Sequence, residues 1–224
     1  MNKLFLLFLV IFINSCGGTG GGSGEKLREV QNLVNENPGV LEDAIFTEIN
    51  SVRANFTNAQ IRPNPAPEQK APLKRHVNSG GKTLDQVARA HSEASDKRDF
   101  IRMSCQKEVT YKGKYWNYTN TWTSVCPHYN PADQTTAWQR VDIADIANQG
   151  VGEVIAGLPL EWVTDVTPQI IAKQIVDLWM GSPDHRDQIL DKSSTGPYAT
   201  STGIGIFISE KYNLIIATQL FIRD

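Results

Sequence analysis

A histidine and a glutamate in the C-terminal half of the chain are the side chains best placed to do chemistry. His185 follows the segment 178–183, which reads LWMGSP, and Glu153 stands between Gly152 and an apolar run. An imidazole can gain or lose a proton near neutral pH, and a carboxylate can act as a general base toward water. We therefore predict that both side chains face one cleft, which could serve binding or hydrolysis.

An amphipathic helix has to position His185. Apolar residues recur at helical spacing before it, at Ile171, Ile175, Leu178 and Trp179. Thr167 and Pro168 supply an N-cap and a first-turn proline, and Ser182-Pro183 ends the pattern. We expect this helix to be rigidly packed, with His185 located where the chain leaves it for solvent.

Other periodic segments predict an α+β fold. Residues 25–37, 41–56 and 84–97 each carry an apolar stripe at helical spacing. Thr83 and Gln86 form a capping box at the start of the third of these helices. His91 lies on the apolar face of that helix, where a core histidine is a better interpretation than a ligand. The apolar segments 203–209 and 213–221 predict an antiparallel pair of strands near the C-terminus.

Aromatic residues alternate with threonines between residues 106 and 125, around a Lys112-Gly113-Lys114 turn. This pattern predicts a β-hairpin or a three-stranded flap. Its aromatic side chains can pack across the strands, or Trp116 and Trp122 can anchor a partner.

The segment Ile13-Asn14-Ser15-Cys16 resembles the cleavage site of a bacterial lipoprotein signal. Lys3 precedes an apolar run of about ten residues, which is typical of an export signal and too short for a membrane span. The resemblance implies a signal peptide at 1–15, a lipid-modified (palmitate-bearing) Cys16 and a Gly-rich tether at 16–24, with an ordinary cleaved signal as the alternative. The domain is then 25–224, held at the cell envelope, in the periplasm or exposed on the surface.

The cysteine count agrees with an exported protein. The chain has three cysteines, so lipidation of Cys16 leaves Cys105 and Cys126. In an oxidising compartment these two most simply form a disulfide at the base of the aromatic segment, worth roughly 3 kcal/mol in the chain-entropy model. Metal binding by the two cysteines is the alternative.

The charge balance argues against a nucleic-acid partner. The chain has 22 basic and 24 acidic residues, and loss of Lys3 with the signal makes the net charge about −3. No basic stripe stands out along the sequence, so phosphate backbones are poor partners.

Five blocks of the sequence together resemble the CAP superfamily, which is named after cysteine-rich secretory proteins, antigen 5 and pathogenesis-related proteins. The blocks are Ile49-Asn50-Ser51-Val52-Arg53, Ala88-Arg89-Ala90-His91-Ser92, Gly152-Glu153-x-Ile155-Ala156, Trp179-Met180-x-Ser182-Pro183-x-His185-Arg186 and Gly203-Ile204-Gly205-Ile206. They are similar to the bacterial SCP-like branch over residues 40–222. The resemblance implies a three-layer α-β-α sandwich with a central antiparallel sheet.

The resemblance also implies a cleft built from His128, Glu153 and His185. Val154 stands where the family has Asn, and Asp184 where it has Gly. The family's first histidine position holds Arg102 here. The segment His128-Tyr129-Asn130-Pro131, followed by Arg140, resembles the family run that continues from that histidine. We therefore interpret the aromatic segment, at about 101–127, as an insertion and His128 as the displaced first histidine.

Two functions remain open for this cleft. The three side chains are suitable ligands for a divalent ion such as Zn²⁺, or they form a hydrogen-bonded polar cluster without metal. We favour a binding protein for a small apolar ligand, an envelope component or a host surface protein. The alternative is a metal-assisted hydrolase, peptidase-like, with Glu153 as its candidate general base.

Overall fold

The computed structural model describes residues 22–55, 71–77, 81–97, 104–111, 114–121, 128, 135–191 and 199–224, and for 104–121 it describes the backbone. The elements in these ranges are helices α1 (Gly22–Glu36), α2 (Pro38–Asn55), α3 (Leu84–Lys97), α4 (Ala137–Ile143), α5 (Pro168–Gly181) and α6 (Pro183–Ile189), the 3-10 helix η4 (Leu160–Trp162), and strands β1 (Lys74–Arg75), β2 (Ser104–Tyr111), β3 (Lys114–Thr121), β4 (Val151–Pro159), β5 (Ser201–Ser209) and β6 (Leu214–Ile222). The predicted signal, Cys16, Trp122, Cys126 and most of the predicted tether lie outside the described residues.

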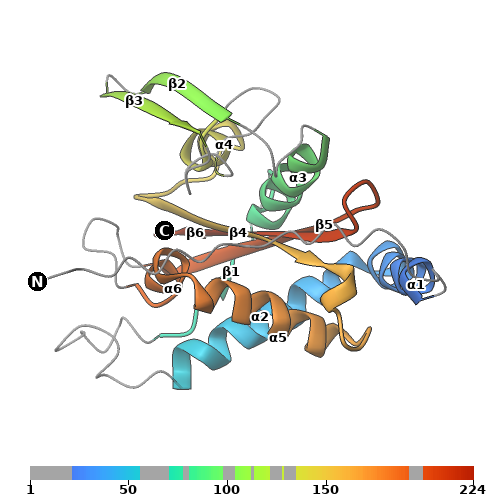
Figure 1. Cartoon of the computed structure of the whole chain (residues 1–224). Helices are drawn as coiled ribbons and strands as arrows, with labels where there is room; N and C mark the ends of the chain where they lie inside the picture. The colour runs from blue at the N-terminus through green and yellow to red at the C-terminus, as the bar shows by residue number, and fades with distance from the viewer. Residues whose placement is uncertain are drawn as a thin grey trace, which may run out of the picture.

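The chain forms an α+β fold in which helices cover both faces of one sheet. The strand order is β1-β5-β6-β4, antiparallel throughout except that β1 pairs in parallel with β5. Helices α3 and α4 cover one face, while α2, α5 and α6 lie on the other (Figure 1). The sandwich that the sequence predicted is therefore present, with a short parallel strand added to the edge of its sheet.

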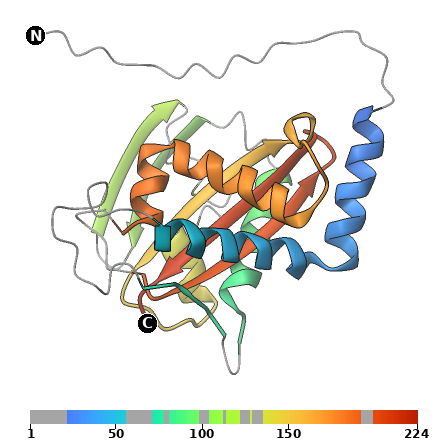
Figure 2. The same cartoon turned by 90° about the horizontal axis from the view of Figure 1, so that it is seen from below.

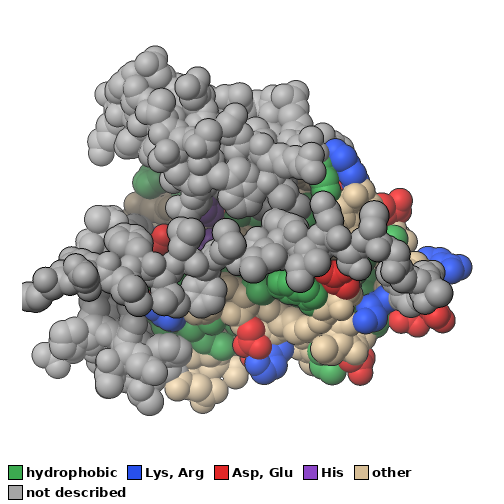
Figure 3. Space-filling view, in the orientation of Figure 1, with side chains coloured by type: hydrophobic (Ala, Val, Ile, Leu, Met, Phe, Trp, Pro, Cys, Tyr) green, Lys and Arg blue, Asp and Glu red, His purple; other side chains and the backbone are tan. Residues whose placement is uncertain are grey.

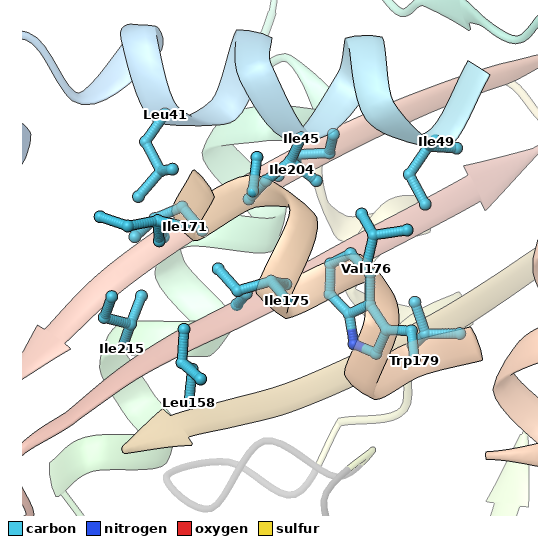
Figure 4. Packing of buried hydrophobic residues seen from close by; sticks show 14 of the residues in the cluster. Leu41, Ile45, Ile49, Leu158, Ile171, Ile175, Val176, Trp179, Ile204 and Ile215 are labelled. Carbon is cyan, nitrogen blue, oxygen red and sulfur yellow. The ribbon is translucent and has the colours of Figure 1, made fainter. Parts of the chain in front are cut away.

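The larger core lies between the sheet and the α2–α5 layer. Apolar side chains of α2 point toward those of α5, and both sets rest on the sheet (Figure 4). The buried stripe includes Leu41, Ile45, Ile49, Ile171, Ile175 and Trp179, each with no exposed surface. Burial of large apolar side chains on this scale is the main source of folding free energy, at about 1.5–3 kcal/mol each.

The predicted start residues of α5 and α3 and the predicted end of α5 are located as expected, although Thr167 makes no side-chain capping hydrogen bond, and one expectation is wrong. Thr167 and Pro168 begin α5, and Thr83 and Gln86 close a reciprocal capping box before α3. His185, however, does not enter solvent at the end of α5. The Ser-Pro step begins a second short helix, α6, and His185 is half-buried on it. A proline is well tolerated in the first turn of a helix, so this step starts α6 as well as ending α5.

Two glycines of β5 let α3 lie directly against the sheet. A Cβ at Gly205 would stand 1.9 Å from the backbone nitrogen of Arg89, and one at Gly203 would stand 2.2 Å from Leu84 Cβ. Ser92 of α3 completes this contact by hydrogen-bonding the Gly205 carbonyl at 3.0 Å and Thr218 Oγ1 at 2.8 Å. The close approach fixes the height of α3, and of His91 on it, above the strands.

The described residues contain no helix with the length and apolar character needed to cross a membrane. The aromatic segment forms the predicted hairpin, in which Val109 pairs with Trp116 and Tyr111 pairs with Lys114. Figure 2 shows the hairpin beside the sandwich and α1 at its opposite end.

We expect Gly205→Ala to lower the free energy of unfolding by about 3 kcal/mol, because the new methyl group meets helix backbone that cannot move without lifting α3. Gly181→Ala is the matched control, since a Cβ there meets nothing within 4 Å. Urea unfolding of both variants measures the difference. Equal midpoints would contradict the tight packing of α3 on β5.

Candidate functional site

Glu153 occupies the centre of the site because of its place on an edge strand. Successive residues of a strand point to opposite faces of the sheet. Leu220, which pairs with Glu153, belongs to the apolar cluster under α3 and α4, so Glu153 points into that layer. The preceding Gly152 faces α6, where an added Cβ would stand 2.1 Å from the side chain of Gln188. Both helical layers therefore approach the strand at this point.

Both oxygens of the Glu153 carboxylate are engaged, although its side chain is only 2% exposed. Arg140 Nη2 donates a hydrogen bond to Oε2, and Nδ1 of His128 lies 3.0 Å from Oε1. Nε2 of His91 lies 3.7 Å from the same Oε1, too far for a hydrogen bond but close enough for electrostatic attraction. A buried carboxylate needs partners of this kind, because an unpaired charge in the interior is strongly unfavourable.

These partners decide the ionisation of Glu153. Burial alone would raise its pKa, but the charge of Arg140, together with His91 and His128, lowers the pKa to about 2. Glu153 is therefore ionised throughout the physiological range. A carboxylate with so low a pKa accepts protons weakly, so the geometry favours a positioning role for Glu153 over general-base chemistry.

Arg140 also fixes the backbone around the site. Its Nη1 donates to the carbonyl oxygens of Thr135, at 2.7 Å, and His128, at 3.1 Å. The helix that carries Arg140 begins with a capping box between Thr136 and Gln139. A single buried guanidinium thus ties α4, the His128 backbone and the Glu153 side chain together.

His185 reaches the site from the opposite layer. Its ring centroid lies 6.3 Å from that of His128, with the two rings nearly perpendicular. Burial and the neighbouring His128 lower the pKa of His185 to about 4, while Asp184 opposes the shift. His185 is therefore neutral at pH 7 and retains an unprotonated ring nitrogen. A small patch of histidine atoms is visible on the face drawn in Figure 3.

A second buried arginine holds the helix that carries His185. Arg53 Nη1 donates to the carbonyl of Ile189, the last residue of α6, at 2.5 Å. Its Nη2 contacts the Ala71 carbonyl at 3.1 Å and Asp191 Oδ2 at 2.9 Å. Arg53, on α2 in the first half of the sequence, thus holds the C-terminal end of α6.

The structure brings together His128, Glu153 and His185, the three residues that the resemblance selected. It adds Arg140 and His91, which sequence reasoning did not assign to the site. His91 has no exposed surface and is a core histidine, as expected, but it also faces the carboxylate of Glu153. For His91 the available signal was a polar residue on an apolar helix face. For Arg140 it was the place of this arginine in the family-like run after His128, which does not show that the side chain is buried. Trp116 lies on β3, and Cys105 lies on β2.

The positions of His128, Glu153 and His185 decide which of them could be ligands of the predicted zinc site. Among the described residues, no group of three or more His, Cys, Asp or Glu is arranged to hold a metal ion. Glu153 does not fit as a ligand, because Arg140 and His128 already occupy its oxygens. The imidazoles of His128 and His185, with ring centroids 6.3 Å apart, are the nitrogen donors that remain, and Glu153 contacts Nδ1 of His128 as carboxylates commonly do for metal-bound histidines.

Among the comparisons with known proteins, only the search of solved structures finds similar proteins. A scan against protein-family models gives no match, and a search of curated protein sequences gives no significant match. The chain is similar to an extracellular protein containing an SCP domain from Bacillus anthracis, with a TM-score of 0.46 and 19% identity, over 82% of this chain and 40% of that one. It is also similar to an outer surface protein from Borrelia burgdorferi, with a TM-score of 0.45 and 15% identity, over 85% of this chain and 94% of that one. This chain therefore spans less than half the length of the Bacillus protein.

Replacing Arg140 by Met should lower the free energy of unfolding by about 3–5 kcal/mol, because it leaves the buried Glu153 charge without its main partner. Adding Glu153→Gln to that variant should recover part of the loss, since the unpaired charge is then gone. Lys173→Met, in an exposed ion pair with Asp177, is the control and should cost no more than about 0.5 kcal/mol. Chemical unfolding of the wild type, the single variants Arg140→Met and Glu153→Gln and the double variant completes the double-mutant cycle, and strictly additive effects would contradict the coupling.

Acid should destabilise the fold through His185 before it affects Glu153. Because the pKa of His185 is lowered from 6.5 to about 4, the unfolded chain binds a proton between these pH values that the folded chain does not. Stability is therefore highest above pH 6.5 and falls as the pH drops toward 4. Allowing for partial exposure, we expect a loss of about 1 kcal/mol at pH 5 relative to pH 7.5.

His185→Asn should remove this part of the pH dependence, which urea unfolding at the two pH values measures. The contribution of Glu153 to the pH dependence has the same sign but lies at lower pH. Its lowered pKa stabilises the fold above pH 4.5, and that stabilisation is lost only between 4.5 and about 2. An unchanged difference between pH 7.5 and pH 5 in the Asn variant would show that other groups are responsible.

Proposed function

We propose that this chain is a CAP-like binding protein, lipid-anchored through Cys16 on the outside of the cell, which takes a small, largely apolar ligand beside its His/Glu cluster. The observation that carries the proposal is a cavity of about 400 Å³ between α3 and α4 that shares Arg140 with the cluster. Cavities of this size are typical of small-molecule sites.

The lining of the cavity suggests the chemistry of its ligand. Its apolar wall consists of Val87, Ala90, Ile143 and Ala144, and Ile143 is 72% exposed. Lys82 adds a positive charge, and Gln86 and Thr135 add hydrogen-bonding groups. An apolar wall with a cationic group suits a ligand with a hydrocarbon body and an anionic head, such as a fatty acid.

The cluster supports binding better than catalysis. Glu153 is ionised and fully engaged, so it gives the site a fixed charge distribution instead of a base that accepts protons. The buried ion pair holds His128 and the wall of the cavity in one arrangement before any ligand arrives. A preformed site loses little conformational entropy on binding.

The hairpin, with Trp116 on β3, remains a second candidate surface for an envelope component or host protein.

Fluorescence titration with a dansyl-labelled undecanoic acid tests the proposal. We expect saturable binding with a dissociation constant of about 1–10 µM. Ala90→Trp should weaken it at least tenfold, because the exposed Ala90 lines the cavity and an indole would fill it. Asp177→Trp, on the exposed face of α5, is the matched control and should bind normally. Equal binding by the two variants would place the ligand elsewhere.

A zinc titration tests the hydrolase alternative, which the facing imidazoles of His128 and His185 favour. If that alternative holds, Zn²⁺ binds with a defined stoichiometry, and this binding is lost in His128→Ala and in His185→Ala. Bound zinc would supply a polarised water at the cluster. Retained zinc binding in both variants would remove this alternative from the His128–His185 site.

A further inference from the structure

We infer that the end of the domain formed by η4 and the first turn of α5 rests on the membrane surface, with Trp162 inserted among the lipid headgroups. This inference rests on the lipid anchor of the proposed function. It adds an orientation, because it states which end of the domain faces the bilayer and which end faces away.

Two large apolar side chains are exposed together at this end. Trp162 is 50% exposed and Ile170 is 37% exposed. Gln174 of α5 donates a hydrogen bond to the Trp162 carbonyl at 2.7 Å, which holds η4 against the helix that begins two residues before Ile170. We call Trp162 and Ile170 the apolar tip. Tryptophan is enriched at membrane interfaces, where its ring lies in the apolar boundary and its N–H reaches water or headgroups.

The start of α1 places the predicted anchor beside the apolar tip. Lys26, in the second turn of α1, donates a hydrogen bond to the carbonyl of Val163 at 2.6 Å, next to Trp162. Figure 2 shows the beginning of α1 close to the loop that follows β4. Only six Cα–Cα steps separate Cys16 from Gly22, where α1 begins, and such a segment spans at most about 20 Å. A lipid on Cys16 therefore keeps the tip within reach of the bilayer.

The charges around the tip indicate which lipid surface it fits. Glu161 and Asp165 flank it and are both exposed. These carboxylates would be repelled by an anionic bilayer, so the contact depends on insertion of the indole and fits a zwitterionic phosphatidylcholine surface. Because one exposed Trp binds weakly alone, the tip acts only when the anchor raises its local concentration.

The same geometry directs the candidate site away from the membrane. Strand β4 runs from Val151 to Pro159, and η4 follows its end. At about 3.3 Å per residue, Glu153 lies roughly 20 Å along the strand from η4. The His/Glu cluster and α4 are therefore at the end of β4 farthest from the anchor, where they meet ligands or partners arriving from the external medium.

Tryptophan fluorescence of the full lipid-modified chain tests the orientation. The protein is reconstituted into phosphatidylcholine vesicles, with and without bromine atoms on the acyl chains, because bromine quenches an indole that reaches it. We expect bromine quenching in the wild type and the loss of at least half of it in Trp162→Phe. Trp138→Phe, on α4 at the other end of β4, is the matched control and should keep the quenching.

The outcomes distinguish the anchor from the apolar tip. Wild-type chain that does not float with vesicles would overturn the anchor and the orientation together. Chain that floats, but whose quenching is the same in Trp162→Phe as in the wild type, would overturn the apolar tip alone. Loss of quenching in Trp138→Phe instead would place the opposite end of the domain on the membrane.

Discussion

The buried ion pair between Arg140 and Glu153 is the constraint on which the candidate site depends. Glu153 can remain charged in the interior only because a guanidinium and an imidazole occupy its oxygens. In meeting that requirement, Arg140 also holds the carbonyls of Thr135 and His128. The ion pair thus fixes α4, His128 and the wall of the cavity relative to β4. Buried pairs of this kind often add little net stability, so its effect here is mainly to select one arrangement of the polar groups.

The helical layers bring the remaining groups to this pair through close packing. Gly203 and Gly205 allow α3 to lie directly on β5, which places His91 beside the carboxylate of Glu153. Gly152 allows α6 to approach the edge strand from the other face. Arg53 then fixes the end of α6, so that His185 faces His128. These three glycines and the buried Arg53 are therefore as important to the site as its histidines.

The two ends of the molecule differ in chemistry. At one end of β4 lie the charged cluster, the cavity and α4. At the other end lie the exposed Trp162 and Ile170, close to the start of α1. If the proposed N-terminal anchor holds the protein, contact with the anchoring surface leaves the candidate site uncovered. The strand that carries Glu153 thus separates the candidate site from the apolar tip.

The sequence by itself determined the elements and part of the site. Apolar periodicity and turn residues located α3, α5, the hairpin and the C-terminal strands, because local backbone preferences and amphipathic faces are encoded in short segments. The resemblance selected His128, Glu153 and His185. Only the tertiary structure decided that His185 lies on a second helix, that His91 faces Glu153, and that Arg140 and Arg53 are buried clamps. Arginine is usually exposed, and whether it is buried depends on partners that are distant in sequence, such as Asp191 for Arg53. Such pairings arise when the layers pack, so no local pattern of residues reveals them.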